Sequence, residues 1–257
     1  MYFLIPVFNE EENISDLMES FSQLTSKLKD YSCQFFLLND GSTDKTVEQF
    51  ELHSKRHNLE TNILSLDKNQ GPGAAFRLGF NHIKKLMMDE DLLITMEGDN
   101  TSNVDLIQIM IDRLIRENYE IVLASAYTYG GGFQSTSAFR MLLSHFGNGF
   151  TKFFLKIHGI HTLSSFFRLF NYSSIQKLDE KYGDNIFSLN GFESVVEVLA
   201  KCTFLKIKIS EVPMIVDWTK RKGKSKMKVI KTIIAYFNLY LHAKKIVFCN
   251  YVTNKNS

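Results

Sequence analysis

The first half of the chain alternates short apolar runs with longer stretches in which apolar residues recur every three or four positions. Short apolar runs are typical of buried strands, and the longer periodic stretches are typical of amphipathic helices. The expected strands cover residues 2–5, 35–38, 62–66, 92–96 and 120–124. The expected helices cover residues 11–29 and 44–57, a stretch from Gly73 to about 87, and residues 103–117. This alternation predicts an α/β fold with a mostly parallel sheet and helices on both faces.

Ligands of such sheets bind beyond the carboxyl ends of the strands. The loops that follow residues 5, 38, 66, 96 and 124 are therefore expected to line one edge together. Candidate functional residues are sought first in these loops.

The second half is less regular. Residues 138–158 form an aromatic amphipathic pattern, residues 191–201 predict a helix, and residues 203–216 predict strands interrupted at Pro213. From 227 to about 248 the pattern is helical, apolar and basic, so this segment either packs on the domain or lies in a membrane interface. We expect a main domain over residues 1–226 and a C-terminal amphipathic helix and tail over 227–257.

The charge is small overall but uneven. The 257 residues carry a net charge of +2, which argues against nucleic acid as a partner of the whole chain. Residues 220–231 nevertheless contain seven Lys or Arg and no acid. Such a stretch favours phosphate groups or an anionic membrane surface, and the alternative is a solvated basic loop.

Cysteine content and hydropathy bear on location. The three cysteines, Cys33, Cys202 and Cys249, are too far apart in sequence for a metal-ligand motif or a disulfide framework, which favours a reducing compartment. Residues 1–5 lead directly into a strand without a leader pattern, and no apolar run reaches the roughly 20 residues of a membrane span. We expect a cytoplasmic protein, peripheral on the cytoplasmic face of a membrane.

Two carboxylates follow the strand expected at 92–96, with one glycine between them: Glu97, Gly98 and Asp99. Carboxylates at a strand end can share a divalent cation with a diphosphate, and such oxygen-rich sites suit Mg²⁺ or Mn²⁺. The alternative is an ordinary turn, because Asp and Gly are common turn residues.

Polar or glycine-rich segments also follow three other strands. They read Pro6-Val7-Phe8-Asn9-Glu10-Glu11-Glu12-Asn13-Ile14, Asn39-Asp40-Gly41-Ser42-Thr43-Asp44, and Asn69-Gln70-Gly71-Pro72-Gly73-Ala74-Ala75. An acid in the second segment can accept a hydrogen bond from a nucleotide base, and glycines in the third let a backbone approach a ligand at a helix start. The alternatives are helix caps and tight turns.

These segments resemble, in order and spacing, the motifs of inverting family 2 glycosyltransferases with the GT-A fold, a Rossmann-like α/β fold. They match P-x-Y-N-E-x-x-N-I, D-D-G-S-x-D, N-x-G-x-G-x-A and D-x-D of that family. Downstream matches include Arg140 in R-x-x-x-S-x-x-x-N, Arg168 in D-x-T-S-G-F-R, Glu197 in G-F-x-x-x-x-E, and Arg221 and Lys226 in R-x-G-x-S-K. Within the family, the chain resembles the dolichyl-phosphate mannose synthase and polyprenyl-phosphate glycosyltransferase branch.

The resemblance implies a nucleotide-sugar donor, a Mg²⁺ or Mn²⁺ cofactor and a lipid-phosphate or glycan acceptor. It implies Asp99 and Glu97 as metal ligands, and Asp99, Arg221 and Glu197 as catalytic residues. The nucleotide-sugar-binding residues that it implies are Pro6, Phe8, Glu10, Asn39, Asp40, Gly71, Gly73, Glu97, Gly98, Arg140, Arg168 and Lys226. The chain is also expected to meet a membrane surface, and a membrane-anchoring partner or a homo-oligomer is left open.

The chain departs from the family pattern at several positions. Glu97 replaces an Asp, Asn39 replaces an Asp, Ala126 replaces an Arg, and Thr162 and Phe166 replace an Asp and a Gly. The missing acid at 162 favours a lipid phosphate, which is already ionised and needs no general base. Glu193 and Glu197 remain candidates for the base that a sugar hydroxyl would need.

Two other classes compete with a glycosyltransferase. A nucleotidyltransferase also combines a parallel sheet with metal-binding carboxylates, but it would form a nucleotide-sugar instead of consuming one. A non-catalytic relative would bind a nucleotide-sugar without turnover.

Overall fold

The computed structural model describes residues 1–135, 148–155, 157–223 and 234–241. Its main sheet has seven strands in the order β3-β2-β1-β4-β7-β5-β8. β1 (Tyr2–Val7), β2 (Gln34–Asn39), β3 (Glu60–Ser65) and β4 (Leu92–Thr95) run parallel to their neighbours in this set. β5 (Ile121–Ser125) and β8 (Ile209–Pro213) are also parallel to each other. The predicted α/β fold with a mostly parallel sheet is confirmed.

One antiparallel strand separates these two sets. β7 (Arg168–Asn171) lies between β4 and β5 and runs antiparallel to both. We did not predict this strand, nor α6 (Tyr172–Tyr182) directly after it. The prediction missed β7 because its sequence, Arg-Leu-Phe-Asn, has polar residues at both ends and is only four residues long.

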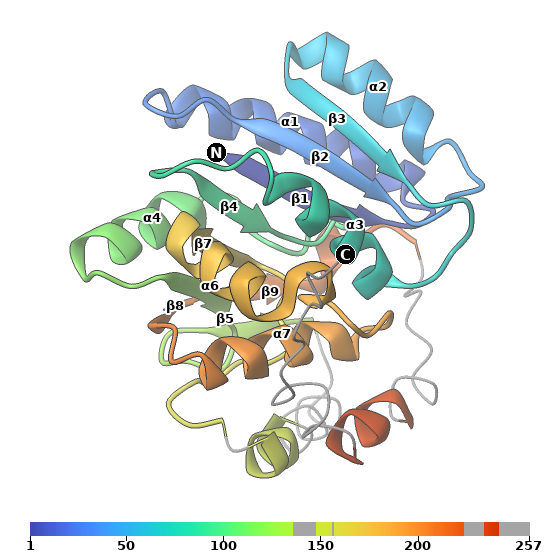
Figure 1. The fold of residues 1–257 in the computed structure, drawn as a ribbon. Helices are drawn as coiled ribbons and strands as arrows, with labels where there is room; N and C mark the ends of the chain where they lie inside the picture. Colours follow the sequence, from blue (N-terminus) through green and yellow to red (C-terminus); the bar gives the residue numbers. More distant parts are fainter. Residues whose placement is uncertain (136–147, 156, 224–233, 242–257) are drawn as a thin grey trace, which may run out of the picture.

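Helices cover both faces of the sheet (Figure 1). α1 (Glu11–Lys27), α2 (Thr46–His57), α3 (Pro72–Ile83) and α4 (Leu106–Arg116) connect the strands of the first half. α7 (Glu193–Phe204) follows in the second half, where we predicted residues 191–201. The predicted strand region 203–216 contains the end of α7, then β8 (Ile209–Pro213) and β9 (Ile215–Asp217). β8 ends at Pro213, which confirms the predicted break between strands at this residue.

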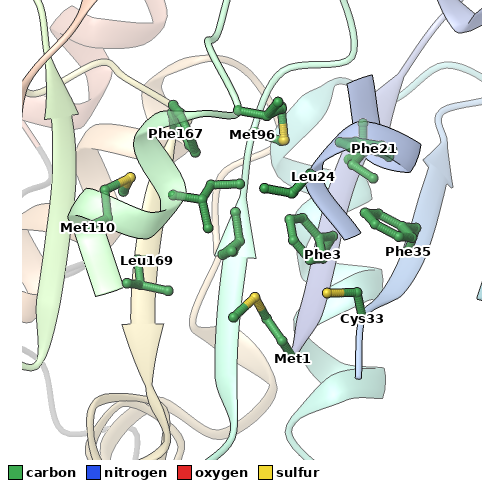
Figure 2. Close-up of a cluster of buried hydrophobic side chains, with 14 of the residues drawn as sticks. Met1, Phe3, Phe21, Leu24, Cys33, Phe35, Met96, Met110, Phe167 and Leu169 are labelled. Carbon is green, nitrogen blue, oxygen red and sulfur yellow. The ribbon is translucent and has the colours of Figure 1, made fainter. Parts of the chain in front are cut away.

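Side chains of β1 alternate between two apolar cores. Leu4 belongs to the core beneath α3, α6 and α7, whereas Phe3 and Ile5 belong to the core beneath α1 and α4. Figure 2 shows Phe3, Phe21 and Phe35 packed together in this second core, with ring centroids of Phe21 and Phe35 4.4 Å apart. Both faces of the central strands are buried, which explains their continuous apolar sequences.

Two further strands make a small separate ladder. β6 (Gly132–Gln134) pairs in parallel with β9, and the short 3₁₀ helix η2 (Trp218–Lys220) follows β9. Main-chain bonds from Met214 to Ser125 and from Gly132 to Met214 join this ladder to the end of β5. The ladder therefore fixes the start of the basic stretch relative to the main sheet.

The described part of the C-terminal segment is helical over 234–241, and residues 148–155 form a second helical segment. They pack together, with Thr151 Oγ1 2.5 Å from Tyr240 Oη and the rings of Phe154 and Tyr240 stacked. Leu239 is fully buried in the core. The C-terminal segment thus packs on the domain through one face, one of the two alternatives left by its sequence. Residues 157 and 158, at the end of the helix expected over 138–158, are not helical. The remaining parts of the helices expected at 138–158 and 227–248 lie outside the described residues.

Candidate active site

The loops after β1, β2 and β4 meet at one edge because these strands are parallel neighbours. Gly98 packs against the end of β1, where an added Cβ would lie 2.6 Å from Val7 Cγ1 and 3.3 Å from the carbonyl oxygen of Pro6. A larger residue at 98 would push the acidic loop away from β1. Gly98 therefore allows the close packing that brings Glu97 and Asp99 to the loop containing Glu10.

Asp99 lies at this edge with a side chain that is mostly buried. Its Oδ1 accepts hydrogen bonds from Thr101 Oγ1 at 2.6 Å and from the Thr101 main-chain N–H at 3.2 Å. Asn100, between them, has a left-handed backbone with φ of 64°, a conformation that Asn tolerates better than most residues. This tight turn fixes the orientation of the Asp99 carboxylate and leaves Oδ2 for another partner.

Glu97 is held more firmly. Its Oε2 accepts from Ser102 Oγ at 2.5 Å, and its Oε1 accepts from the main-chain N–H of Phe166 at 3.2 Å. Burial raises the pKa of Glu97, the nearby charge of Asp99 raises it further, and the hydrogen bonds to its carboxylate oppose both effects. The two acids thus repel each other, and positive charge at this edge would stabilise both as carboxylates.

The partner of Asp99 is Arg221, which comes from the basic stretch. Arg221 Nη1 lies 3.1 Å from Asp99 Oδ2, and Arg221 Nη2 lies 3.8 Å from Glu10 Oε1. All three side chains are at most 15% exposed, so solvent screens this cluster less than a surface pair. The start of the basic stretch therefore folds back onto the acidic loop.

The carboxylates at this edge can be compared with the ligands that a divalent cation requires. Within the described residues, no three His, Cys, Asp or Glu side chains form a complete metal-binding group. Mg²⁺ and Mn²⁺ sites are nevertheless often built from one or two protein carboxylates completed by substrate phosphates and water. Asp99, with Glu97 beside it, fits that kind of site.

Asn39 and Asp40, in the segment 39–44 after β2, form hydrogen bonds within the protein. Asp40 accepts from the main-chain N–H groups of Gln70 at 2.7 Å and Gly71 at 2.8 Å, and Asn39 bonds with Ser42 and Ser65. Burial raises the pKa of Asp40, and the two main-chain hydrogen bonds act against that rise. These contacts join the loop after β2 to the glycine-rich loop before α3.

The glycine-rich loop also packs on protein. Gly71 has φ of 107°, and a Cβ added at Gly71 or Gly73 would collide with the carbonyl oxygens of Asn190 or Leu189. We expected these glycines to admit a ligand. The structure shows instead that the close approach requiring them is to residues 189–191 of the same chain, so a ligand contact at either residue stays a prediction.

Among the other predicted binding residues, Pro6 lies within β1 and is partly exposed, as is Phe8 just beyond it. Glu10 is buried and contributes to the Arg221 cluster. Arg140 and Lys226 lie outside the described residues, so their roles stay predictions.

Arg168 is fully enclosed in a structural role. Its Nε donates to the carbonyl oxygen of Ser165 at 2.8 Å, and its Nη2 donates to that of Leu163 at 3.0 Å. Burial lowers its pKa to about 10, although nearby Cys202 and Glu97 act in the opposite direction. Our prediction that Arg168 contacts the donor does not agree with this environment, because its guanidinium supports the loop that precedes β7.

Glu197 is also poorly placed for catalysis. Its side chain is fully buried, pairs with Lys201 Nζ at 2.5 Å, and accepts from the main-chain N–H groups of Ser188 and Leu189. Glu193 is buried too and accepts from the Gly191 N–H at 3.1 Å. The structure therefore gives Glu197 the role of a structural anchor, which corrects our prediction of a catalytic residue.

Two residues that organise this region, Asn13 and Glu211, had no predicted role. Asn13 bonds to Glu10 and to Lys222, and Glu211 bonds to the main-chain N–H groups of His161 and Thr162. Asn13 lies inside the recognised motif P-x-Y-N-E-x-x-N-I, and that position was the available signal, whereas Glu211 lies in β8. The contacts of both residues join distant segments that periodicity does not connect.

Several large apolar side chains on the helical segments 148–155 and 234–241 face solvent. The exposed set comprises Phe150, Phe153, Phe154, Ile234, Phe237 and Leu241. Over the described residues, no helix has both the length and the apolar character required to cross a membrane.

Sequence comparisons connect this chain to known proteins. A family model described as "Glycosyl transferase family 2" matches residues 2–179. A dolichyl-phosphate beta-glucosyltransferase of Drosophila melanogaster is 24% identical over 231 residues, covering 86% of this chain and 67% of that protein. A dolichol-phosphate mannosyltransferase of Pyrococcus furiosus is 26% identical over 235 residues, covering 91% of this chain and 60% of that protein.

A shorter match joins the chain to an undecaprenyl-phosphate 4-deoxy-4-formamido-L-arabinose transferase of Edwardsiella ictaluri. It is 33% identical over 97 residues, which are 37% of this chain and 28% of that protein. Across these three relatives, the matches thus span from 28% to 67% of the relative's own length.

Solved structures share the fold. The mannosyltransferase PcManGT from Pyrobaculum calidifontis, in complex with GDP-Man and Mn²⁺, aligns over 95% of this chain and 63% of its own, with a TM-score of 0.58 and 12% identity. TarS residues 1–349 of S. aureus, in complex with UDP, align over 94% of this chain and 65% of their own, with a TM-score of 0.55 and 13% identity.

Proposed function

The chain belongs to glycosyl transferase family 2, and we propose that it is a metal-dependent, inverting glycosyltransferase that moves a sugar from a nucleotide-sugar to a polyprenyl or dolichyl phosphate. The observation that carries this proposal is the 3.1 Å contact between Arg221 and Asp99 at the carboxyl edge of the sheet. It unites an acid suited to a divalent cation with a fixed positive group suited to a diphosphate.

The proposed donor site uses residues from two segments, the acidic loop after β4 and the basic stretch. Asp99, with Glu97, would hold Mg²⁺ or Mn²⁺, which would supply positive charge to the nucleoside diphosphate as it leaves. Arg221 would pair with diphosphate oxygens from the other side, since a guanidinium can form two parallel hydrogen bonds to a phosphate. Both groups stabilise charge that develops during bond cleavage, where preorganised electrostatic groups have their largest effect on rate.

The surroundings of the candidate bases support a lipid phosphate as acceptor. Glu193 and Glu197 are buried with carboxylates that accept main-chain N–H groups, so neither is presented to an incoming hydroxyl. A phosphate acceptor is ionised at neutral pH and attacks without a base. The names of the relatives from Drosophila melanogaster and Pyrococcus furiosus, which mention dolichyl or dolichol phosphate, agree with this choice.

The exposed apolar set supports binding at a membrane surface. Phe153 is 79% exposed and Phe237 is 58% exposed, each on a helical segment anchored by buried neighbours. Aromatic side chains on anchored helices suit the interface of a bilayer, and the basic stretch suits the anionic cytoplasmic face. Phe153→Ser should lower co-sedimentation with phosphatidylserine vesicles, whereas Met88→Ser, a control at a site before β4 that is 70% exposed, should not. Equal binding by both variants would exclude this surface.

The reaction is tested by a donor panel followed by product analysis. Thermal shifts with UDP- and GDP-sugars, each with Mn²⁺ or Mg²⁺, should show stabilisation by one donor and only with a cation. That donor, mixed with dolichyl phosphate in detergent, should then release nucleoside diphosphate and form a lipid-linked sugar. Binding of the donor without release of nucleoside diphosphate would indicate a non-catalytic relative. Transfer only to glycan hydroxyls would show that the acceptor is a glycan and not a lipid phosphate.

A further inference from the structure

A single buried residue, Asn13, contacts all three segments of the candidate site, through its side chain and its main chain. Asn13 lies in the first turn of α1 and is 1% exposed. Its amide nitrogen donates to Glu10 Oε2 at 2.5 Å and to the carbonyl oxygen of Lys222 at 3.1 Å. Its amide oxygen accepts from the main-chain N–H of Lys222 at 2.9 Å.

These contacts use both donors of the amide and hold Lys222 by its two main-chain groups. The amide thus pairs with Lys222 as a neighbouring strand would, although the two residues are 209 positions apart. Asp and Ser cannot reproduce this pairing, because Asp has no N–H donor, and Ser is shorter and has only one donor. The main-chain carbonyl of Asn13 also accepts from Asn100 Nδ2 at 2.9 Å, which connects the acidic loop to the same helical turn.

Fixing the backbone at Lys222 determines where Arg221 can reach. The β6–β9 ladder fixes the chain on one side of Arg221, and Asn13 fixes it on the other. Between these supports, the guanidinium lies at Asp99 Oδ2 and near Glu10. Arg221 therefore contacts Asp99 Oδ2, the same carboxylate oxygen that a divalent cation would need as a ligand.

We propose that Asn13 is a positioning residue that keeps Arg221 on Asp99 until a nucleotide-sugar and its cation arrive together. The inference rests on the proposed function and adds a mode of control to it. When a diphosphate is present, Arg221 transfers to the phosphate oxygens a short distance away, and Asp99 Oδ2 becomes available. A cation alone must instead displace the guanidinium, so the cation and the diphosphate bind cooperatively.

This arrangement predicts changes in opposite directions when Asn13 is replaced. Asn13→Ala should tighten binding of Mn²⁺ alone about fivefold, because Arg221 no longer competes firmly for Asp99. The same change should weaken binding of UDP or GDP in saturating Mn²⁺ about fivefold or more, because Arg221 is no longer held for the diphosphate. General destabilisation of the fold would weaken both.

A second variant removes the contact from the loop side. Lys222→Pro deletes the N–H that Asn13 accepts, and Arg221 already has φ of −76° and ψ of 125°, which suits a residue before proline. It should change binding in the same two directions as Asn13→Ala without altering α1. Asp16→Asn is the matched control, since the Asp16 carboxylate pairs with the half-exposed Lys222 ammonium at 2.6 Å and not with the Lys222 main chain, and it should leave both affinities unchanged.

The experiment measures free Mn²⁺ by electron paramagnetic resonance and nucleotide binding by calorimetry, with GDP and UDP tested separately. In an Arg221→Met background, Asn13→Ala should add nothing to Mn²⁺ affinity, because the two residues act as one unit. The inference would be overturned if Asn13→Ala raised Mn²⁺ affinity as much in the Arg221→Met background as in the unmodified protein. It would also be overturned if Asn13→Ala and Lys222→Pro both left Mn²⁺ affinity unchanged. Failure of the unmodified chain to bind either nucleotide with Mn²⁺ would instead reject the proposed function.

Discussion

Two acid–base pairs of this protein have the same chemistry and opposite surroundings. Glu197 and Lys201 lie four residues apart on α7, and both side chains are fully buried. Asp99 and Arg221 come from loops 122 positions apart, and both side chains retain some exposure at the rim of the sheet. The first pair can form as soon as α7 forms, whereas the second requires most of the fold.

The hydrogen bonds around each pair show why one is fixed and the other can exchange. Lys201 Nζ also donates to the carbonyl oxygens of Asn185 and Ile186 and to Ser188 Oγ, and it lies 4.8 Å from the centre of the Tyr182 ring. Arg221 instead pairs with the carboxylates of Asp99 and Glu10, whose side chains are 13% and 9% exposed at the carboxyl edge of the sheet. A saturated buried pair supports structure, while a pair at a rim can change partners when a ligand arrives.

The largest expected effect is a loss of activity without a loss of stability when Asp99, at the rim of the sheet, is replaced. Asp99→Asn should reduce sugar transfer by at least about 10³-fold, because it removes the carboxylate proposed to hold the cation. Its melting temperature should stay close to that of the unmodified protein. Initial rates and thermal melts measure the two quantities, and Asp105→Asn is the control, since that acid pairs with Lys27 on the exposed surface. Substantial transfer by Asp99→Asn would exclude a cation role for this residue.

The buried pair should behave in the reverse way. Lys201→Met should lower the free energy of unfolding by about 3 kcal/mol, because it leaves the Glu197 carboxylate buried without its cation. Adding Glu197→Gln should recover part of this loss, since Gln keeps an oxygen for the N–H groups of Ser188 and Leu189 without a buried charge. Denaturant unfolding measures both changes. If Lys201→Met were as stable as the unmodified protein, the pair would not be a structural anchor.

A smaller effect is expected at Glu120, whose surroundings are intermediate between the two pairs. Its carboxylate accepts from Lys177 Nζ at 2.6 Å, from Ser173 Oγ at 3.2 Å and from the Lys208 N–H at 3.1 Å. Burial acts to raise the pKa of Glu120, but the hydrogen bonds and the charge of Lys177 outweigh it, so the pKa lies below its ordinary value. The folded state therefore favours the ionised form.

A lowered pKa fixes the direction of the pH dependence. The stabilisation from Glu120 is complete above its pKa in the unfolded chain, which is about 4.3, and disappears as the pH falls through the lower folded value. Glu120→Gln should therefore cost about 1 kcal/mol of unfolding free energy at pH 7 and progressively less below about pH 4. Unfolding curves at several pH values measure the difference. A difference independent of pH would show that the charge of Glu120 contributes nothing.

Much of the fold follows from local pattern. The strands near 2–5, 35–38 and 92–96 are apolar on both faces because helices cover both, and such runs are visible in sequence. β7 could not be predicted in this way, since Arg168 is buried only because the carbonyls of Leu163 and Ser165 receive its guanidinium. That information exists only in the folded loop.

The site was predictable to a similar extent. The motifs predicted that Glu10, Asp99 and Arg221 belong to one site, and the structure places their side chains in contact. Glu197 matched its motif position equally well, but its partner lies one helical turn away, on a helix whose burial the sequence did not reveal. Motif matching thus identified important acids without distinguishing those that face a ligand from those that anchor a loop.

The long separation between Asn13 and Lys222 has a consequence during synthesis. A ribosome delivers Glu10 and Asp99 more than a hundred residues before Arg221, so the nascent domain spends part of its synthesis with these acids unopposed. The amide of Asn13 meets its backbone partner, Lys222, only after β9 has been synthesised. The order of translation alone therefore makes completion of this rim one of the last events in the maturation of the described domain.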